Sequence, residues 1–204
     1  MARTPASPGP EVRKKQILDA AIELFGQKGY SVATAAEIAE KAGLSSGSVF
    51  HYFGNKKELF REALRSCAAD LKGAMTRGHP PTDDIKTFMK MTSRNFFGYL
   101  LEHPMKVKVL FHSPDTLADQ DIKHEYGRVM EDLYKFLYSI LEGAQKRGEL
   151  PDDLYVRGVA EYALGFTFFM SYLYFLDISW FQGGDVFQFT EGDYLIDYLT
   201  RPRK

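Results

Sequence analysis

Two short helical segments separated by a glycine turn constrain the fold of this chain more than any other feature. Thr34-Ala-Ala-Glu37 has the pattern of a capping box, in which the threonine hydroxyl accepts the N3 amide and the glutamate reaches back to the cap amide. The helix that begins there ends at Gly43, and Ser45 can cap a second helix that ends near Gly54. Two short helices joined by such a turn are typical of a helix-turn-helix.

Longer helices are predicted on both sides of this pair. Ile17, Ala21, Leu24 and Phe25 recur at the spacing of one helical face, and Gly29 is suited to end their helix. After the pair, Asn55-Lys-Lys-Glu58 resembles a capping box and begins a helix that continues to about Met75. The helix-turn-helix therefore belongs to a small helical domain.

The rest of the chain also has helical periodicity and no convincing alternation with period two, which predicts an all-α fold. Gly78-His-Pro-Pro81 must interrupt the chain, and Ser113-Pro114 has the pattern of an N-cap followed by proline at N1. Beyond residue 80, helices are expected over Thr82–Glu102, Pro104–His112, Asp121–Arg147, Asp152–Trp180 and Gly192–Thr200.

Between Gln16 and Leu59 the chain resembles the DNA-binding domain of the TetR family of transcriptional regulators. The residues that carry the resemblance, in order, are Ile17-Leu-Asp-Ala-Ala21, Leu24-Phe25, Gly29-Tyr30, Thr34, Glu37-Ile-Ala39, Ala42-Gly-Leu-Ser45, Gly47, Tyr52-Phe53, Lys56 and Glu58-Leu59. The resemblance implies a three-helix DNA-binding domain followed by a helical ligand-binding and dimerisation domain. It also implies that the chain is not an enzyme.

The second short helix is expected to be the recognition helix, with its N-terminus directed at DNA. Its free amides and dipole favour a phosphate, and Gly47 allows the backbone to approach the duplex. Ser48 and His51 share a face and can reach base edges, whereas Val49 and Phe53 would face inward. By resemblance, phosphate contacts fall to Thr34, Tyr52 and Lys56. The expected DNA-binding set is Thr34, Ser45, Ser46, Gly47, Ser48, Phe50, His51, Tyr52 and Lys56.

Two positions depart from the family pattern. The family usually has tyrosine where this chain has Phe50, and often a second threonine where it has Ala35. Both departures remove a hydroxyl that could bind phosphate, so Lys41 and Arg13 are candidates to supply that contact.

The expected organisation is a flexible tail over residues 1–10, the DNA-binding domain over residues 11–56 and the ligand-binding and dimerisation domain over residues 57–204. A homodimer formed through Asp152–Trp180 and Gly192–Thr200 would present two recognition helices to a near-palindromic double-stranded operator. A small hydrophobic effector would release this repressor from DNA. The pocket expected for it is lined by Met89, Phe96, Phe97, Phe111, Tyr126, Phe166 and Met170.

Composition argues against several other classes of protein. A single cysteine excludes an internal disulfide, and no Cys or His cluster has the spacing of a metal site, so neither a metal nor a cofactor is expected. Tyr162–Leu176 is uncharged but shorter than the roughly 20 residues of a membrane span. The proline-rich N-terminus lacks the apolar core of a signal peptide, which indicates the cytoplasm.

Two other interpretations stay open from the sequence. A small helical enzyme would need a site that the sequence does not display, since a phosphate-binding glycine loop, a nucleophile elbow and paired metal ligands are all missing. A helical adaptor that no longer reads DNA would be compatible with Phe50 and Ala35. Binding of duplex DNA distinguishes a regulator from both.

Overall fold

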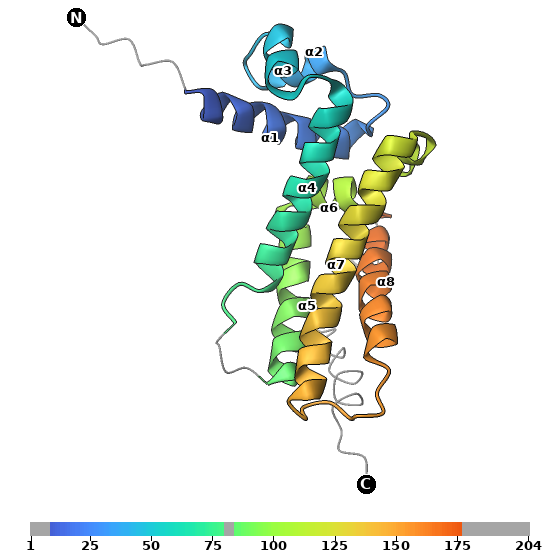
Figure 1. The fold of residues 1–204 in the computed structure, drawn as a ribbon. Coiled ribbons are helices and arrows are strands. Elements are labelled where there is room, and N and C mark those ends of the chain that lie inside the picture. The colour runs from blue at the N-terminus through green and yellow to red at the C-terminus, as the bar shows by residue number, and fades with distance from the viewer. Residues whose placement is uncertain (1–8, 80–83, 177–204) are drawn as a thin grey trace, which may run out of the picture. The chain divides into compact units, whose positions relative to one another are not determined.

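The computed structural model describes residues 9–79 and 84–176, and every regular element in this part of the chain is helical (Figure 1). The elements are α1 (Pro10–Lys28), α2 (Ala35–Lys41), α3 (Ser46–Phe53), α4 (Lys56–Met75), α5 (Ile85–Glu102), α6 (Pro104–Phe111), the 3-10 helix η1 (Pro114–Ala118), α7 (Gln120–Lys146) and α8 (Val156–Phe175). The all-α prediction is confirmed for these residues. The helix predicted over Gly192–Thr200 and most of the predicted tail lie outside the described residues.

The chain divides into two compact units. Unit 1 combines the described part of Met1–Cys67 with Met105–Glu125, and unit 2 combines the described parts of Ala68–Pro104 and Tyr126–Lys204. The helices α4 and α7 each contribute residues to both units, because the divisions fall within them.

The core of unit 1 forms around the apolar face of α1. Ile17, Ala21, Leu24 and Phe25 are all buried, as their spacing predicts, and the edge of the Phe25 ring packs on another ring of the core, 5.1 Å away between centroids. That partner belongs to α4, whose fully buried side chains include Leu59, Phe60, Ala63, Leu64 and Cys67. These contacts fix α1 and the first turns of α4 as the support for α2 and α3.

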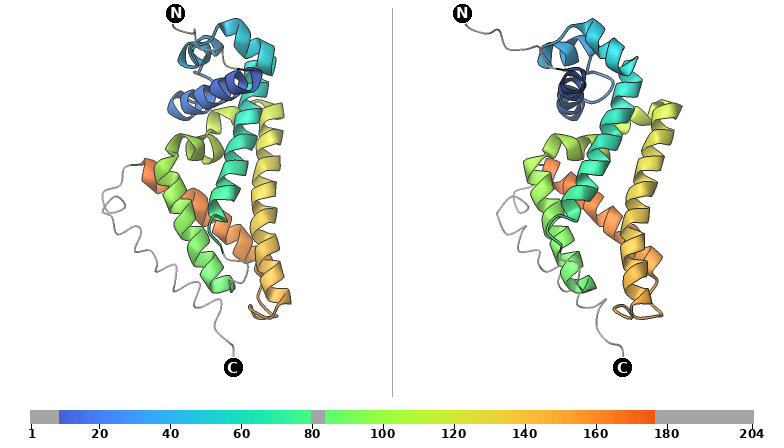
Figure 2. Two further views of the ribbon diagram at one scale, coloured as in Figure 1. Left: turned by 90° about the vertical axis from the view of Figure 1, so that its left-hand side faces the viewer. Right: turned by 60° about the vertical axis from the view of Figure 1, so that its left-hand side comes forward.

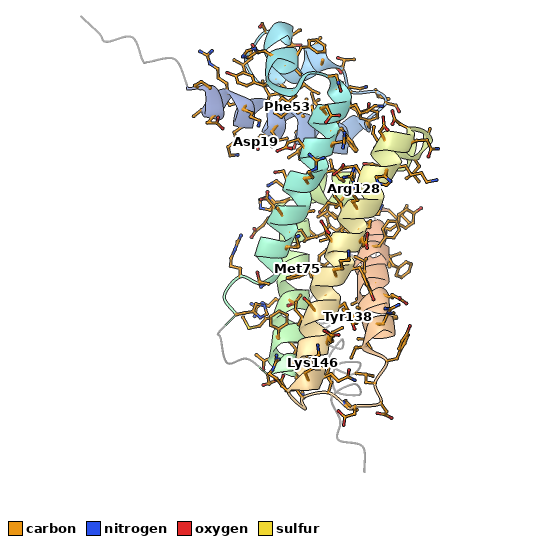
Figure 3. The ribbon with its side chains drawn as sticks, viewed as in Figure 1. Asp19, Phe53, Met75, Arg128, Tyr138 and Lys146 are labelled. Atoms are coloured by element: carbon orange, nitrogen blue, oxygen red, sulfur yellow. The ribbon has the colours of Figure 1, made fainter. Side chains whose placement is uncertain are left out.

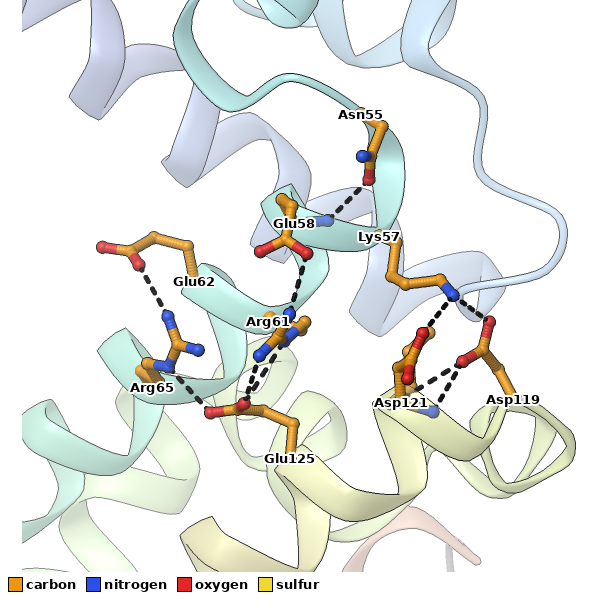
Figure 4. A network of polar contacts seen from close by, with 10 residues as sticks. Asn55, Lys57, Glu58, Arg61, Glu62, Arg65, Asp119, Asp121 and Glu125 are labelled. Atoms are coloured by element: carbon orange, nitrogen blue, oxygen red, sulfur yellow. Dashed lines mark hydrogen bonds and ion pairs between the residues drawn. The ribbon is translucent and has the colours of Figure 1, made fainter.

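Unit 1 also includes segments that follow α3 in the chain. In α1, a Cβ at Gly26 would lie 2.7 Å from the carbonyl oxygen of Met105, so only glycine allows α6 to approach this closely. In Figure 4, basic side chains of α4 reach acidic side chains near the start of α7. Lys57 Nζ lies 2.9 Å from a carboxylate oxygen of both Asp119 and Asp121. The larger unit results from these contacts between segments distant in sequence.

The same network includes an almost completely buried carboxylate. The side chain of Glu125 is only 4% exposed and receives two hydrogen bonds from Arg61, at 3.0 and 3.2 Å, and one from Arg65, at 2.7 Å (Figure 4). Hydrogen bonding to Glu125 raises the pKa of both guanidinium groups. This cluster ties α4 to the first turns of α7 within unit 1.

Unit 2 contains α5 and α8 together with the C-terminal parts of α4 and α7. In both views of Figure 2, α8 (orange) crosses between α5 (green) and α7 (yellow). One buried cluster at the lower part of these helices joins all three, and its members are Ile85, Leu141, Ala144, Leu150, Val156 and Ala160. The amide of Ile85 also donates to Glu149 Oε2 at 2.8 Å, which fixes the start of α5.

The helix predicted from Asp152 begins later, at Val156. A side-chain contact across the loop explains this, because the Gln145 side-chain amide donates to the backbone carbonyls of Pro151, at 2.8 Å, and Leu154, at 3.0 Å. Those bonds hold the intervening residues as a turn. Among the helices that the structure describes, α8 included, none is both long enough and apolar enough to cross a bilayer.

Candidate nucleic-acid interface

The predicted capping box at the start of α2 is present. Thr34 Oγ1 accepts a hydrogen bond from the Glu37 amide at 3.2 Å, and the Thr34 amide donates to Glu37 Oε2 at 3.0 Å. Lys28 Nζ lies 2.6 Å from the other oxygen of this carboxylate. The Lys28 ammonium, with the amide and hydroxyl of Thr34, lowers the pKa of Glu37 to about 2. The N-terminus of α2 is thus satisfied by the protein's own side chains.

A left-handed glycine makes the turn from α2 to α3. Gly43 has φ 68°, a conformation that residues with a Cβ rarely adopt, and the Leu44 amide returns to the Ala39 carbonyl at 2.9 Å. Ser45 then takes the extended conformation of an N-cap. The turn places α3 beside α2, as expected for a helix-turn-helix (Figure 1).

The N-terminus of α3 differs from that of α2, because it has no side-chain cap. The prediction that Ser45 caps α3 holds for the backbone, but its hydroxyl pairs with the Ser48 hydroxyl at 3.0 Å instead of accepting a backbone amide. The first amides of α3 therefore receive no side-chain acceptor, and Ser46 and Gly47 are exposed there. Free amides at a helix N-terminus favour an anion such as phosphate.

The two faces of α3 have opposite characters. Val49 and Phe53 are buried, as predicted, and Lys14 Nζ lies 5.7 Å from the centroid of the Phe53 ring, whose position is marked in Figure 3. The outward face is made of Ser46, Gly47, Phe50, His51 and Gly54, all exposed. Half of the Phe50 surface is accessible, although the side chain is purely apolar. Thr34 is also exposed, whereas Ser48 and Tyr52 are half-buried.

Lys56 does not project toward solvent as a phosphate ligand would. Its Nζ donates to the carbonyls of Tyr30, at 2.9 Å, Ser31, at 3.3 Å, and Ala33, at 3.0 Å. It also lies 4.6 Å from the centroid of the Tyr30 ring. An ammonium has three hydrogens, so these carbonyls occupy all of them. In this structure Lys56 holds the loop between α1 and α2.

Four of the seven residues predicted for an effector pocket line one cavity in unit 2. These are Met89, Phe96, Phe97 and Phe166. Tyr126 and Met170 belong to unit 2 but are not among the residues that line the cavity, and Phe111 is buried in unit 1. Helical spacing predicts that these apolar residues lie on buried faces. It does not predict whether a buried side chain lines the cavity of unit 2 or packs elsewhere, as Phe111 does in unit 1.

The structure adds cavity residues that the sequence did not single out. They include Phe88 and Thr92 on α5, and Leu137 on α7. Thr92 is the only one of these three with a polar side-chain atom, and no apolar pattern could have indicated it.

The imidazole of His112 lies outside this cavity. Burial, and secondly the charge of Lys108, lower the pKa of His112 to about 4, so its imidazole is neutral at physiological pH. Within residues 9–79 and 84–176, no group of three or more His, Cys, Asp or Glu could hold a metal ion.

Comparison with known proteins yields a family match in the N-terminal part of the chain. Residues 17–63 match the sequence model of "Bacterial regulatory proteins, tetR family". The HTH-type transcriptional regulator BetI of Stenotrophomonas maltophilia is 40% identical over 83 residues, which are 38% of this chain and 42% of that protein. BetI of Vibrio parahaemolyticus is 26% identical over 162 residues, 73% of this chain and 81% of that protein. The match to the first of these relatives therefore spans only about two fifths of its length.

Solved structures share the fold over nearly the whole chain. The fatty acid degradation regulator FadR from Bacillus halodurans superposes with TM-score 0.76 at 17% identity, covering 95% of this chain and 96% of that one. FadR from Bacillus subtilis, solved in complex with stearoyl-CoA, gives 0.76 at 18%, covering 93% and 99%. A SmeT–triclosan complex gives 0.69 at 16%, covering 89% and 90%. At sequence identities of 16–18%, these similarities show a shared fold and not a shared function.

Proposed function

We propose, from the match of residues 17–63 to the model of bacterial regulatory proteins of the tetR family, that the chain is a member of this family and a sequence-specific, DNA-binding transcriptional repressor of the cytoplasm. The observation that carries the proposal is the N-terminus of α3, which is exposed and lacks the side-chain cap that closes α2. In the proposed complex α3 enters the major groove. The protein acts as a regulator and not as a catalyst.

The residues on and around α3 divide between two kinds of contact. Thr34, Ser45, Tyr52 and the amides of Ser46 and Gly47 face the phosphates, which set the register of the protein on the duplex. Ser48, Phe50 and His51 face base edges, where sequence is read. Lys56 supports this surface from behind by fixing the loop between α1 and α2.

We propose that the repressor acts as a homodimer. Tyr162, Gly165, Phe169 and Tyr172 on α8, with Leu176 at its C-cap, recur at alternating steps of three and four residues, and all five are exposed. Apolar side chains at this spacing form the seam between packed helices. Two copies joined along α8 would present two α3 helices to half-sites about 34 Å apart, so the operator would be near-palindromic.

The cavity in unit 2 is the proposed binding site of a small hydrophobic effector. It lies among α5, α7 and α8, and its volume is about 150 Å³. The same fold is found in one protein solved with stearoyl-CoA and in another solved with triclosan. Each of these two ligands has a large apolar part. An effector that binds one arrangement of the dimer more tightly than the other would lower the affinity for DNA.

A glycine-to-aspartate substitution in α3 tests the proposal. Gly47 lies in the first turn of α3, and its nearest neighbour to an added Cβ is Ser45 Oγ at 3.8 Å, so Gly47→Asp should fold normally. The new carboxylate would be attracted to the free amides at the N-terminus of α3 and would repel the phosphates of DNA. We expect affinity for duplex DNA flanking the protein's own gene to fall more than about 100-fold, measured by fluorescence anisotropy in low salt.

Gly73→Asp is the matched control. Gly73 is also an exposed helical glycine with no atom within 4 Å of an added Cβ, but it lies on α4 in unit 2. This variant carries the same added charge and should bind DNA as the wild type does, with the same steep dependence on salt. Equal affinity of both variants, or no binding of the wild type to any duplex, would contradict the proposal.

A further inference from the structure

The cavity in unit 2 is large enough for a ligand the size of one aromatic ring. Its volume of about 150 Å³ matches that of an engineered apolar cavity that is known to bind benzene. Its walls include Met75, whose position is marked in Figure 3, together with Phe88, Leu137 and Phe166. Such walls offer dispersion and apolar contact to a ligand and few directional interactions.

The chemistry of the walls limits the charge of a ligand. Among the described residues that line the cavity, none is Asp, Glu, Lys, Arg or His. An ion transferred from water into such surroundings would lose its hydration without gaining a counter-charge. The cavity therefore favours an uncharged molecule over a carboxylate or an ammonium.

One hydroxyl in these walls is both buried and unsatisfied. Thr92 is only 9% exposed, and its Oγ1 has no hydrogen-bond partner among the described residues. A threonine inside a helix ordinarily bonds to a carbonyl three or four residues earlier. Thr167, which lines the same cavity from α8, does so, because its Oγ1 donates to the Ala163 carbonyl at 2.8 Å. Thr76 does the same with the Lys72 carbonyl at 3.1 Å.

Because Thr92 lacks the internal hydrogen bond that Thr167 makes, its hydroxyl is a polar group in the cavity walls that a ligand can engage. A buried hydroxyl is usually hydrogen-bonded, and Thr92 can either donate to or accept from a neighbour. Ser93, another polar side chain of the walls, is partly exposed and can be hydrated. Of these two side chains, only Thr92 needs a partner from within the cavity.

We infer that the cavity binds an uncharged, ring-sized apolar molecule with one hydrogen-bonding group, such as a hydroxyl or carbonyl, and that Thr92 selects for this group. The inference rests on the proposed function, since this molecule would be the effector of the repressor. It extends that function by naming the class of ligand and the residue that recognises it.

Four probes that share a benzene ring and differ in its substituent test the inference. They are benzyl alcohol, toluene, benzoate and benzyltrimethylammonium. Their dissociation constants for the full-length protein are measured by calorimetric titration. Benzyl alcohol should bind about fivefold more tightly than toluene, the gain of a typical single hydrogen bond. Both ions should bind more weakly than either.

Two isosteric variants identify the hydroxyl responsible. Thr92→Val removes the unsatisfied hydroxyl and should abolish the preference for benzyl alcohol, while toluene binds at least as well as before. Thr167→Val removes another hydroxyl of the same cavity, but this hydroxyl already bonds to the Ala163 carbonyl. The preference for benzyl alcohol over toluene should therefore persist in this variant. The thermal midpoint of Thr92→Val, which should not fall, shows that the variant is folded.

The possible outcomes separate this inference from the proposed function. A preference that survives Thr92→Val, tighter binding of either ion, or no binding of any probe would overturn the inference, whether or not the protein binds DNA. If the preference is lost only in Thr92→Val, the inference stands, even for a protein that binds no duplex and so lacks the proposed function.

Discussion

Phe50 is the largest side chain on the outward face of α3, and its chemistry limits what it can contact on DNA. Half of its surface is exposed, and it has no hydroxyl to offer a phosphate. In the major groove the C5 methyl group of thymine is the main apolar feature. Gly47, one turn earlier on the same face, leaves space beside the ring. We therefore expect Phe50 to contact a thymine in each half-site.

Replacing thymine with deoxyuridine tests this contact, because only the methyl group is removed. A duplex is first enriched from random sequences with the wild-type protein, and each thymine is then exchanged in turn. At one position of each half-site the affinity should fall about fourfold, since burying one methyl contributes roughly 0.8 kcal/mol. The loss should vanish in Phe50→Ala and persist in His51→Ala. Equal losses in wild type and Phe50→Ala would refute the contact.

Lys56 shows how a single residue can have a role that its motif does not reveal. Its ammonium is bonded to three carbonyls of the loop before α2, so Lys56→Ala would weaken that loop as well as any contact with DNA. Loss of DNA binding in this variant would thus be ambiguous. For that reason the substitution at Gly47, which leaves the internal contacts of unit 1 intact, is the more direct test.

At the scale of elements, the start of α2 should respond to acid. The pKa of Glu37 is lowered to about 2, so its ionised form stabilises the fold above its ordinary pKa of 4.5, and this contribution is lost as the pH falls from 4.5 to 2. Glu37→Gln keeps the capping-box geometry but loses the charge facing Lys28. Wild type should unfold at higher urea than Glu37→Gln at neutral pH, and most of this difference should be gone at pH 2, where about half of the Glu37 side chains are protonated.

Glu40→Gln serves as the control for that experiment. Glu40 lies on the same helix and is exposed, and the described residues give it no ion pair, so its removal should not reproduce the pH-dependent difference. If the gap between wild type and Glu37→Gln were constant across the acid range, the contact with Lys28 would have no part in stability.

The link between α4 and α7 should depend on its buried carboxylate. Glu125→Gln would leave Arg61 and Arg65 without their shared counter-charge, and we expect the free energy of unfolding to fall by about 2 kcal/mol. Asp121→Asn removes a carboxylate that is 71% exposed, so less than about 1 kcal/mol should be lost. Urea titrations of both variants measure the difference, and similar losses would show that burial of Glu125 has no special effect.

The elements that could be predicted from sequence are those specified by neighbouring residues. The capping box at Thr34, the turn at Gly43 and the span of α4 were all predicted from spacing and from residues that begin or end helices. Features set by individual side-chain contacts were not predictable. The late start of α8 depends on hydrogen bonds from Gln145, and the link between α4 and α7 depends on Glu125, which is 64 residues from Arg61 and 60 from Arg65.

The same limit applies to the candidate sites. The outward face of α3 follows from helical periodicity, so its residues could be named in advance. Whether Lys56 points to solvent or to a loop depends on a tertiary contact, and so does the membership of Phe111 in unit 1. The unsatisfied hydroxyl of Thr92 could be recognised only once its surroundings were known.

At the scale of the whole molecule, the proposed dimer should depend on the exposed stripe of α8. Phe169 is 54% exposed at the middle of this stripe. Phe169→Glu would place two like charges near each other across a two-fold axis, so the dimer should dissociate at micromolar concentration. Sedimentation velocity measures this. Val12→Glu makes a comparable change on α1 and should stay dimeric; a monomeric wild type would rule out the proposed assembly.

The fully buried Cys67 in the core of unit 1 has a practical consequence, because it is the only cysteine in the chain. Thiol reagents should leave the folded protein unmodified, so a cysteine introduced in place of Ser46 would carry the single spin label of each subunit. A dimer would then contain one pair of labels, mounted on its two recognition helices. Pulsed electron resonance on that pair would report their separation directly, both in the free protein and in its complex with a duplex.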